Sequence, residues 1–215
     1  MHYLTLLRHG ESQGNSEGIL QGQTDYPLTP AGVKQAEFLA AHWRSESTCF
    51  DLIISSTLKR AAQTAEIISS YLNIPIEYDR DWMERNYGYL EGSLLFEIDK
   101  RIPMVDFFQP YEPIGENGES QVDMYTRASL ALQKVIRQHE GSYLVVSHGG
   151  ILNKALYVVL GITPQGHYNS PVFHFSNAGY AQLQFNATSR QWAVISLNSH
   201  LSNFSDQGEK SWNQD

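Results

Sequence analysis

Arginine and histidine side chains follow three short apolar runs of this chain, and these residue types are suited to binding phosphate. Arg8 and His9 come directly after the first run. Arg60 comes shortly after the second run, and His148 comes directly after the third. The three runs are Tyr3–Leu7, Asp51–Ser55 and Tyr143–Ser147. A guanidinium group binds phosphate oxygens through parallel hydrogen bonds, and a neutral imidazole can act as a nucleophile.

The three runs are typical of buried strands, and parallel neighbouring strands end at the same edge of a sheet. Open α/β sheets bind their ligands outside the carboxyl ends of the strands. If the runs pair in this way, all four side chains converge on one crevice, where helix N-termini add N–H donors for an anion. Taken singly, each residue has a structural alternative: an arginine after a strand is often solvated or paired, and Gly10, Gly149 and Gly150 could simply form turns. The repetition at three strand ends favours an anion site.

The rest of the chain alternates helix-like and strand-like segments, which predicts an α/β fold. Thr29 and Pro30 suit the start of a helix, because threonine caps the first turn and proline fits the first helical position. Thr57 is the expected cap of the next helix, which Asn73 ends. Further helices are expected near residues 93–100, 120–138 and 151–160. Further strands are expected at residues 76–78, 172–175, 179–185 and 191–197, the last two as a hairpin.

Composition excludes several classes of protein. The chain has 215 residues, of which 41% are apolar and 18% charged, so it can build a core and is not a disordered chain. Its formal net charge of −8 argues against broad electrostatic binding of nucleic acid or of an anionic membrane. Cys49 is the only cysteine, so no disulfide forms within the chain. Without a long apolar run or a signal-peptide pattern, we expect a cytoplasmic protein.

We expect one domain over residues 1–200, with one segment of different character. Residues 86–118 hold several prolines and glycines, and we interpret them as a lid or insertion within that domain. We expect most aromatic side chains of this lid to pack onto the sheet. They are Tyr87, Tyr89, Phe96, Phe107, Phe108 and Tyr111. Residues 201–215 are polar, and we expect them to form a flexible C-terminal tail.

Ordered blocks of residues give the chain a second, more specific signature. The first is Leu6-Leu7-Arg8-His9-Gly10-Glu11-Ser12 with Asn15. The others are Leu20-Gln21-Gly22, Asp25–Thr29, Ser55–Thr64, Glu84–Gly88 with Glu91-Gly92, Gly118-Glu119-Ser120 and Ser147-His148-Gly149-Gly150. In this order they resemble the motifs of the histidine phosphatase superfamily, the phosphoglycerate-mutase-like proteins. The resemblance covers residues 3 to about 197, nearly the whole chain.

The resemblance implies a fold, an intermediate and a set of site residues. The fold is a three-layer α/β/α sandwich with a mostly parallel central sheet. His9 is then the nucleophile that forms a covalent phosphohistidine, and Glu84 is the proton donor. The phosphoryl oxygens are held by Arg8, Arg60 and His148, with a further donor from Asn15. The pocket is also lined by Gln21, Gly22 and Gly149.

The chemistry of these residue types agrees with that assignment. Arg8 and Arg60 disfavour a protonated His9 and so keep the ring nucleophilic near neutral pH. The same cations, with His148, stabilise the charge of a transferring phosphoryl group, so no metal and no cofactor is required. A carboxylic acid can protonate the leaving alcohol and later accept a proton from water. Without the resemblance, Glu84 would be interpreted as a surface carboxylate paired with its neighbour Arg85.

The predicted function is a metal-independent phosphomonoesterase that acts on a phosphorylated small molecule. A phosphoglycerate-type mutase is the first alternative, because it shares the site but must also bind the substrate carboxylate. The lid argues against it, since it has two basic residues, Lys100 and Arg101, against six acidic ones. The acidic residues are Glu91, Glu97, Asp99, Asp106, Glu112 and Glu116. The segment Glu84–Leu90 also departs from the pattern of acidic and Trp residues often found in the superfamily. A non-catalytic, phosphate-dependent binding module is the second alternative.

Overall fold

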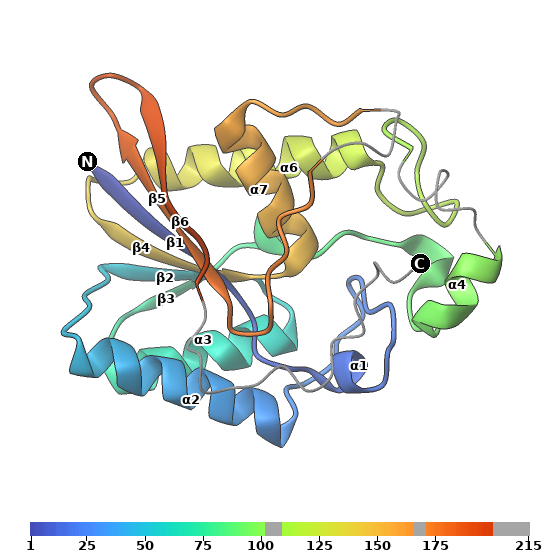
Figure 1. Cartoon of the computed structure of the whole chain (residues 1–215), viewed down its shortest axis with the longest axis horizontal. Helices are drawn as coiled ribbons and strands as arrows, with labels where there is room; N and C mark the ends of the chain where they lie inside the picture. Colours follow the sequence, from blue (N-terminus) through green and yellow to red (C-terminus); the bar gives the residue numbers. More distant parts are fainter. Residues whose placement is uncertain (102–108, 166–170, 200–215) are drawn as a thin grey trace.

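The structure, a computed structural model, has a single sheet at its centre and describes residues 1–101, 109–165 and 171–199. Over these residues the sheet has six strands in the order β3-β2-β4-β1-β5-β6 (Figure 1). The strands are β1 His2–Arg8, β2 Leu52–Ser55, β3 Ile76–Tyr78, β4 Ser142–Ser147, β5 Tyr180–Asn186 and β6 Gln191–Ser199. The first four pair in parallel, and β5 and β6 add to β1 as an antiparallel hairpin. The expected mostly parallel sheet is confirmed.

Helices cover both faces of the sheet, which gives the three layers that the motifs imply. Figure 1 shows α2 and α3 on one face and α6 and α7 on the other. The α-helices are α1 Gln13–Ser16, α2 Pro30–Ser45, α3 Lys59–Leu72, α4 Leu95–Arg101, α6 Gln121–Ile136 and α7 Gly149–Leu160. Two short 3-10 helices, η1 Arg80–Trp82 and η2 Gly88–Leu90, flank the segment that carries Glu84. None of the described helices is both long and apolar enough to cross a bilayer.

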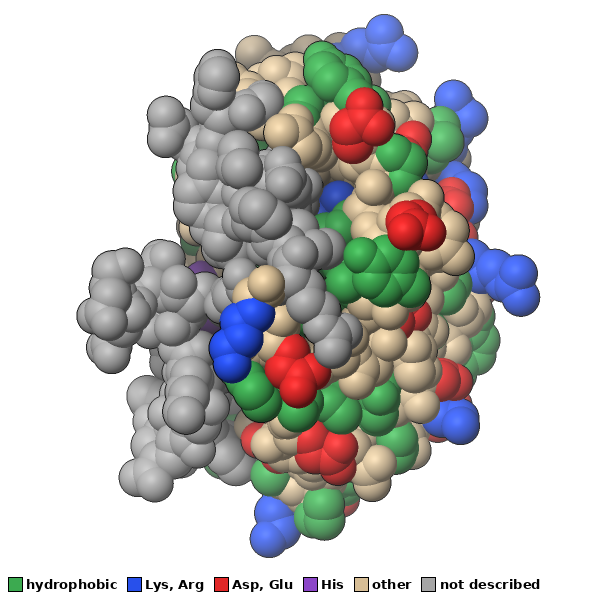
Figure 2. All heavy atoms as spheres, turned by 90° about the vertical axis from the view of Figure 1, so that its right-hand side faces the viewer, with side chains coloured by type: hydrophobic (Ala, Val, Ile, Leu, Met, Phe, Trp, Pro, Cys, Tyr) green, Lys and Arg blue, Asp and Glu red, His purple; other side chains and the backbone are tan. Residues whose placement is uncertain are grey.

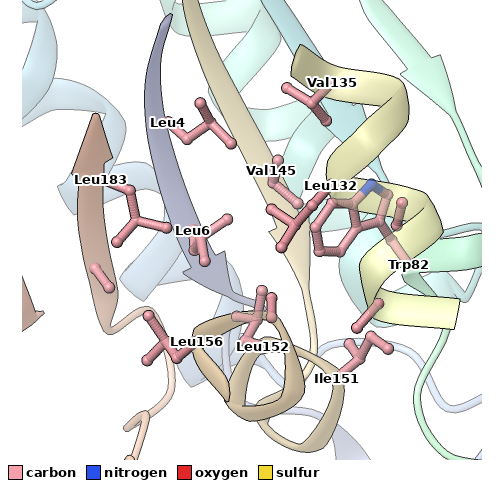
Figure 3. Close-up of a cluster of buried hydrophobic side chains, with 14 of the residues drawn as sticks. Leu4, Leu6, Trp82, Leu132, Val135, Val145, Ile151, Leu152, Leu156 and Leu183 are labelled. Atoms are coloured by element: carbon pink, nitrogen blue, oxygen red, sulfur yellow. The ribbon is translucent and has the colours of Figure 1, made fainter. Parts of the chain in front are cut away.

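Two apolar clusters hold the layers together. Successive side chains of a strand point to opposite faces, so a strand buried on both sides is apolar throughout. On β1, Leu4 and Leu6 face α6 and α7, where Leu132 and Leu152 meet them (Figure 3). Leu7 faces the other way and belongs to the cluster beneath α2 and α3. This packing fixes the position of the end of β1, from which Arg8 and His9 extend.

The start of α3 differs from the prediction. Thr57 is exposed and does not cap the helix, because Leu58 is the N-cap residue and makes no side-chain cap. A side chain from another segment replaces it: the Asp25 carboxylate accepts the Lys59 backbone N–H at 2.6 Å. The predicted caps at the other positions are confirmed. Thr29 accepts the Gly32 N–H at 3.0 Å, and Asn73 ends α3 in the left-handed conformation.

The predicted strand at residues 172–175 is wrong. This segment has no strand pairing and lies against α7, where Asn153 Nδ2 donates to the Phe173 carbonyl at 3.2 Å. The Tyr157 hydroxyl likewise donates to the Pro171 carbonyl at 2.7 Å. Helix side chains therefore replace a neighbouring strand as partners of this backbone. The predicted short helix near residues 93–100 is confirmed as α4, which begins two residues later, at Leu95.

The lid aromatics do not pack onto the sheet as expected. Tyr89, Phe96 and Tyr111 are 56%, 62% and 76% exposed. A small cluster of aliphatic side chains holds this segment instead. It consists of Leu20, Leu90, Ile98 and Ile114, with Tyr87 and Leu95 against it. Phe107, Phe108 and the tail at 201–215 lie outside the described residues, and the assignment of residues 1–200 to one domain stays a prediction.

Surface charge on the side of α4 agrees with the acidic composition. Figure 2 shows acidic side chains spread over the described part of this face, without a continuous basic patch. A protein that binds nucleic acid through its phosphates needs clustered lysine and arginine on one face. This face therefore gives no support to nucleic-acid binding.

Candidate active site

The sheet brings the four predicted cationic and imidazole side chains to one place. β2, β4 and β1 are adjacent and parallel, and their carboxyl ends lie at the same edge of the sheet. The His9 and His148 rings are 5.1 Å apart between centroids, and Arg60 Nε lies 3.1 Å from His148 Nδ1. A Cβ at Gly149 would lie 3.8 Å from Arg8 Nε, so Arg8 runs beside the first turn of α7. The expected convergence is confirmed.

His9 is buried and held in one orientation. Its Nδ1 lies 2.6 Å from the Gly10 carbonyl oxygen. Because a carbonyl only accepts, Nδ1 carries the proton and Nε2 keeps a free electron pair. Burial lowers the pKa of His9 well below 6.5, and the charges of Arg60 and Arg8 lower it further. The ring is thus a neutral base with one defined nucleophilic nitrogen.

Close packing behind His9 explains the glycine that follows it. A Cβ at position 10 would lie 2.5 Å from the Gly32 carbonyl oxygen, so α2 leaves room only for glycine. The Gly10 N–H donates to Thr64 Oγ1 on α3 at 3.1 Å. The backbone beside His9 is therefore fixed by two helices.

His148 is also buried and neutral. Arg60 Nε–H donates to its Nδ1, so Nε2 carries the proton and donates to Ser56 Oγ at 2.8 Å. Burial, followed by the charge of Arg60, lowers the pKa of His148 well below 6.5. Ser56 was not identified from the sequence as a site residue. The signal available was its place directly after β2, at the same sheet edge as His9.

Arg60 connects the sheet edge to the loop after α1. Arg60 is 1% exposed, and it donates from Nη2 to the Gly22 carbonyl at 2.7 Å and from Nη1 to the Thr24 carbonyl at 3.0 Å. Burial lowers the pKa of Arg60 to about 10, which still leaves it charged at neutral pH. Arg60 therefore supplies a fixed positive charge and also shapes the loop at residues 22–24.

Glu91 organises the same loop from the lid side. Its carboxylate accepts the Gln23 N–H at 2.9 Å and the Thr24 hydroxyl at 2.9 Å. Gly22 has φ +52°, and a Cβ there would lie 2.2 Å from Glu91 Oε1. The positive φ favours glycine at this position, and the absence of a side chain leaves room for the Glu91 carboxylate. Glu91 belongs to one of the recognised motifs, but the sequence alone did not indicate this contact.

Asn15 and Gln21 meet at Ser12, the N-cap of α1. The Ser12 hydroxyl lies 2.8 Å from Asn15 Oδ1 and 2.7 Å from Gln21 Oε1. Asn177 Nδ2 lies 3.2 Å from both Asn15 Oδ1 and the His9 carbonyl, and so connects α1 to His9. Since local contacts use the Asn15 oxygen, its Nδ2 is the atom suited to donate to a ligand. Asn177 carried no sequence signal, because it reaches the site through a loop without a motif.

Glu84 lies on the N-terminus of α7, close to His148. Its carboxylate oxygens accept the backbone N–H groups of Gly150 at 3.0 Å, Ile151 at 3.2 Å and Arg85 at 2.8 Å. A Cβ at position 150 would lie 2.4 Å from Glu84 Oε1, so glycine allows this approach. Arg85 is 2% exposed and donates from Nε to the Glu119 carbonyl. The alternative of an exposed Glu84–Arg85 pair is therefore wrong.

These groups together place guanidinium donors, which suit a dianion, beside a neutral imidazole and a carboxyl group. The predicted residues Arg8, His9, Arg60, His148 and Glu84 gather around the ends of β1 and β4, and the loops that hold Gln21 and Gly22 close one side. Within the residues described, no three His, Cys, Asp or Glu side chains gather in a way that could hold a metal ion. The positive charge on hand here is that of the guanidinium groups.

The two buried histidines predict a loss of stability in mild acid. In the unfolded chain each ring binds a proton below about pH 6.5, whereas in the folded protein burial opposes this. The unfolded state therefore holds more protons, and the free energy of unfolding falls as pH falls below this value. From pH 7.5 to 5.5 we expect a progressive fall in the free energy of unfolding, to which both rings contribute. Urea denaturation in phosphate-free buffer measures this dependence.

A variant isolates the contribution of one ring. His9→Asn removes one of the two groups, so the free energy of unfolding should fall more in the wild type than in the variant over that pH range. Equal losses in the two proteins would show that His9 titrates normally in the folded state.

Comparisons with known proteins agree with this geometry. The family model of the histidine phosphatase superfamily (branch 1) matches residues 4–200. The uncharacterized phosphatase PhoE of Bacillus subtilis (strain 168) is 34% identical over 207 residues, which are 95% of this chain and 99% of that protein. The probable phosphoglycerate mutase GpmB of Salmonella paratyphi A is 35% identical over 163 residues, 73% of this chain and 74% of that protein.

A solved structure has the same fold. A mutant phosphoserine phosphatase from Entamoeba histolytica in complex with phosphoserine matches with a TM-score of 0.78 at 28% identity. The match covers 93% of this chain and 98% of that one. From the match to the family model, the shared fold and the ordered motifs around His9, the chain belongs to the histidine phosphatase superfamily, branch 1.

Proposed function

We propose that this protein is a phosphomonoesterase that hydrolyses a phosphorylated small molecule through a phosphohistidine at His9, without a metal ion. The observation that carries the proposal is the state of His9: Nδ1–H is bound to the Gly10 carbonyl, and the pKa of the ring is lowered by burial and by Arg60 and Arg8. Such a ring offers Nε2 as a nucleophile within a cationic pocket at neutral pH.

The first step transfers the phosphoryl group to the protein. His9 Nε2 attacks phosphorus, the bond from phosphorus to the ester oxygen breaks, and the leaving alcohol takes a proton from the Glu84 carboxyl group. Arg8 and Arg60 bind the phosphoryl oxygens, where negative charge is spread in the transition state, and His148 donates to them through its Nε2–H, which in the free protein is directed to Ser56. Asn15 adds a further donor through Nδ2.

The second step releases inorganic phosphate. Water attacks phosphorus, the Glu84 carboxylate accepts a proton from that water, and the bond from phosphorus to Nε2 breaks. His9 returns as a neutral ring with its Nδ1 proton in place. The guanidinium groups supply the positive charge throughout, which is why we propose a reaction independent of metal ions.

Phosphatase activity is favoured over mutase activity by two considerations. The relatives of this chain include proteins named as phosphatases over nearly its full length, whereas the probable mutase GpmB matches over 73% of it. The lid carries more acidic than basic residues, and this balance disfavours a bound substrate carboxylate.

The exposed, free thiol of Cys49 fits the expected cytoplasmic location.

A panel of phosphomonoesters tests the function. We expect purified protein to release inorganic phosphate from p-nitrophenyl phosphate and from some alkyl phosphates of small metabolites, with no added metal and in the presence of a chelator. A second assay uses 3-phosphoglycerate with 2,3-bisphosphoglycerate as primer. Rapid formation of 2-phosphoglycerate with little free phosphate would establish a mutase instead, and binding of phosphate without turnover of any ester would establish a binding module.

A further inference from the structure

A half-buried ion pair lies behind the loop that carries Glu84, and the proposed reaction has not used it. The pair joins Arg127 of α6 to Glu119, the residue just before the N-cap of that helix. We infer that Arg127 and Glu119 are positioning residues, which hold the backbone at residues 81–86 so that the Glu84 carboxyl group reaches the reacting oxygen. This inference rests on the proposed function, because it assigns a role through Glu84.

Arg127 binds the backbone of this loop at several points. Its Nη1 donates to the carbonyl oxygens of Asp81, at 3.0 Å, and of Met83. Its Nη2 donates to the carbonyl oxygen of Glu84 at 3.1 Å. The planar fork of one guanidinium thus fixes three carbonyl groups in the segment that ends at the proposed proton donor.

Glu119 completes the arrangement from the other side. Its carboxylate accepts Arg127 Nε and Nη2, each at 2.7 Å, and Oε2 also accepts the Asn86 N–H at 2.8 Å. The Glu119 backbone N–H donates to the Asn86 carbonyl at 2.8 Å, and its carbonyl accepts Arg85 Nε at 3.0 Å. The loop is therefore held immediately before and after Glu84.

The start of α6 makes the pair rigid. Ser120 caps the helix, its hydroxyl accepting the Asp123 N–H at 3.1 Å, and Asp123 returns a contact to the Ser120 N–H at 3.0 Å. This capping box fixes the direction in which the chain enters the helix. Glu119, just before the cap, and Arg127, two turns further along, consequently keep a fixed separation that matches the bidentate contact.

The loop lacks regular secondary structure, so individual hydrogen bonds hold it, and those of Arg127 and Glu119 lie on both sides of Glu84. Residues 83–87 lie between two short 3-10 helices and outside regular secondary structure. Glu84 must hold its carboxyl group over the N-terminus of α7 within a fraction of an ångström, since misplacement by about 1 Å can cost on the order of 10²-fold in rate. The motif Gly118-Glu119-Ser120, so far without a role, thereby acquires one.

Leaving-group dependence tests the inference, because a proton donor matters most when the alcohol is a poor leaving group. The reference is Glu84→Gln, which should lower kcat for an alkyl phosphate by ~10²-fold or more and for p-nitrophenyl phosphate much less. Arg127→Lys keeps a cation but loses the fork. We expect it to lower kcat for the alkyl phosphate by about 10- to 100-fold and for p-nitrophenyl phosphate by less than about threefold.

Lys134→Gln is the matched control. Lys134 lies on the same helix and binds the Asp79 and Asp81 carboxylates of the η1 region at 2.9 Å and 2.7 Å, on the exposed side. The Lys134→Gln variant loses a contact between α6 and the η1 region but none to the Glu84 backbone. Its kcat should therefore be unchanged for both substrates. In the double variant of Glu84→Gln with Arg127→Lys, the alkyl phosphate rate should equal that of Glu84→Gln within about twofold.

The results distinguish the positioning role of Arg127 from the proton-donor role of Glu84. Equal losses on both substrates, or no loss, in Arg127→Lys would overturn the positioning role while Glu84→Gln still discriminates. If Glu84→Gln does not discriminate, Glu84 is not the proton donor, and the inference fails together with that part of the proposed function. Should Arg127→Lys not fold, as judged by thermal melting, Glu119→Gln provides the same comparison, because it weakens the pair and keeps the shape of the side chain.

Discussion

Replacing His9 by alanine is expected to lower kcat for every phosphomonoester by ~10⁴-fold or more, because alanine has no nitrogen with which to form the covalent intermediate. The variant should keep its fold, since the strand before His9 is held by its own pairing with β4 and β5. Release of p-nitrophenolate under saturating substrate measures the loss. A good leaving group should not rescue the variant, because bond formation to phosphorus is what it lacks.

His42→Ala is the control for this experiment. His42 lies on α2, away from the ends of β1 and β4, and should tolerate the change with unchanged kcat. If His9→Ala retains more than about a tenth of the wild-type rate, the nucleophile is another group and the proposed mechanism is wrong.

Replacing Arg60 by alanine is expected to produce the second-largest effect, a fall of ~10³-fold or more in kcat/KM. Loss of a single donor to a developing anion costs about 10²- to 10³-fold. Arg60 in addition holds the carbonyl oxygens of Gly22 and Thr24 and contacts His148 Nδ1, so its removal also loosens the loop and the second histidine. Inhibition by inorganic phosphate should weaken in parallel, since the same charge binds the product.

Lys59→Ala provides the matched control for Arg60. Lys59 is the preceding residue of α3, but it is exposed and lies 4.0 Å from the Asp25 carboxylate at the surface. Its replacement should change kcat/KM by less than about twofold. Arg60→Lys should lose nearly as much as Arg60→Ala, because an ammonium group cannot reach two carbonyl groups and a phosphate together. Full activity in Arg60→Lys would show that charge alone matters at this position.

The central layers of the fold could be predicted because their signals are local. The runs that became β1 and β4 are apolar on both faces, as parallel strands between two helical layers must be. Thr29 and Asn73 mark helix ends through their own backbone and side-chain chemistry. The composition of residues 172–175 suits a strand and so predicts one. In the structure, side chains of α7 bind this backbone in place of a neighbouring strand. That contact depends on tertiary structure and leaves no local pattern.

Some residues of the candidate site could likewise be predicted from local signals, and others could not. Arg8, His9 and His148 could be placed because each adjoins a predicted strand end, and parallel pairing brings such ends together. Ser56 also follows a predicted strand, but a serine there carries no sign that it bonds to His148, and Asn177 lies in a loop without a motif. The roles of Glu119 and Arg127 could not be predicted for another reason. Their spacing in the sequence predicts a fixed separation of the two side chains, but it does not indicate which backbone segment they bind.

The covalent intermediate itself provides the most direct test. Wild-type protein is mixed with a phosphomonoester labelled in the phosphoryl group, quenched within milliseconds in alkali, in which phosphohistidine survives, and digested for peptide mapping. We expect the label on His9, lost on brief acid treatment and absent from the His9→Ala variant. Label on another residue, or turnover of substrate with no labelled protein at any quench time, would contradict a phosphohistidine mechanism.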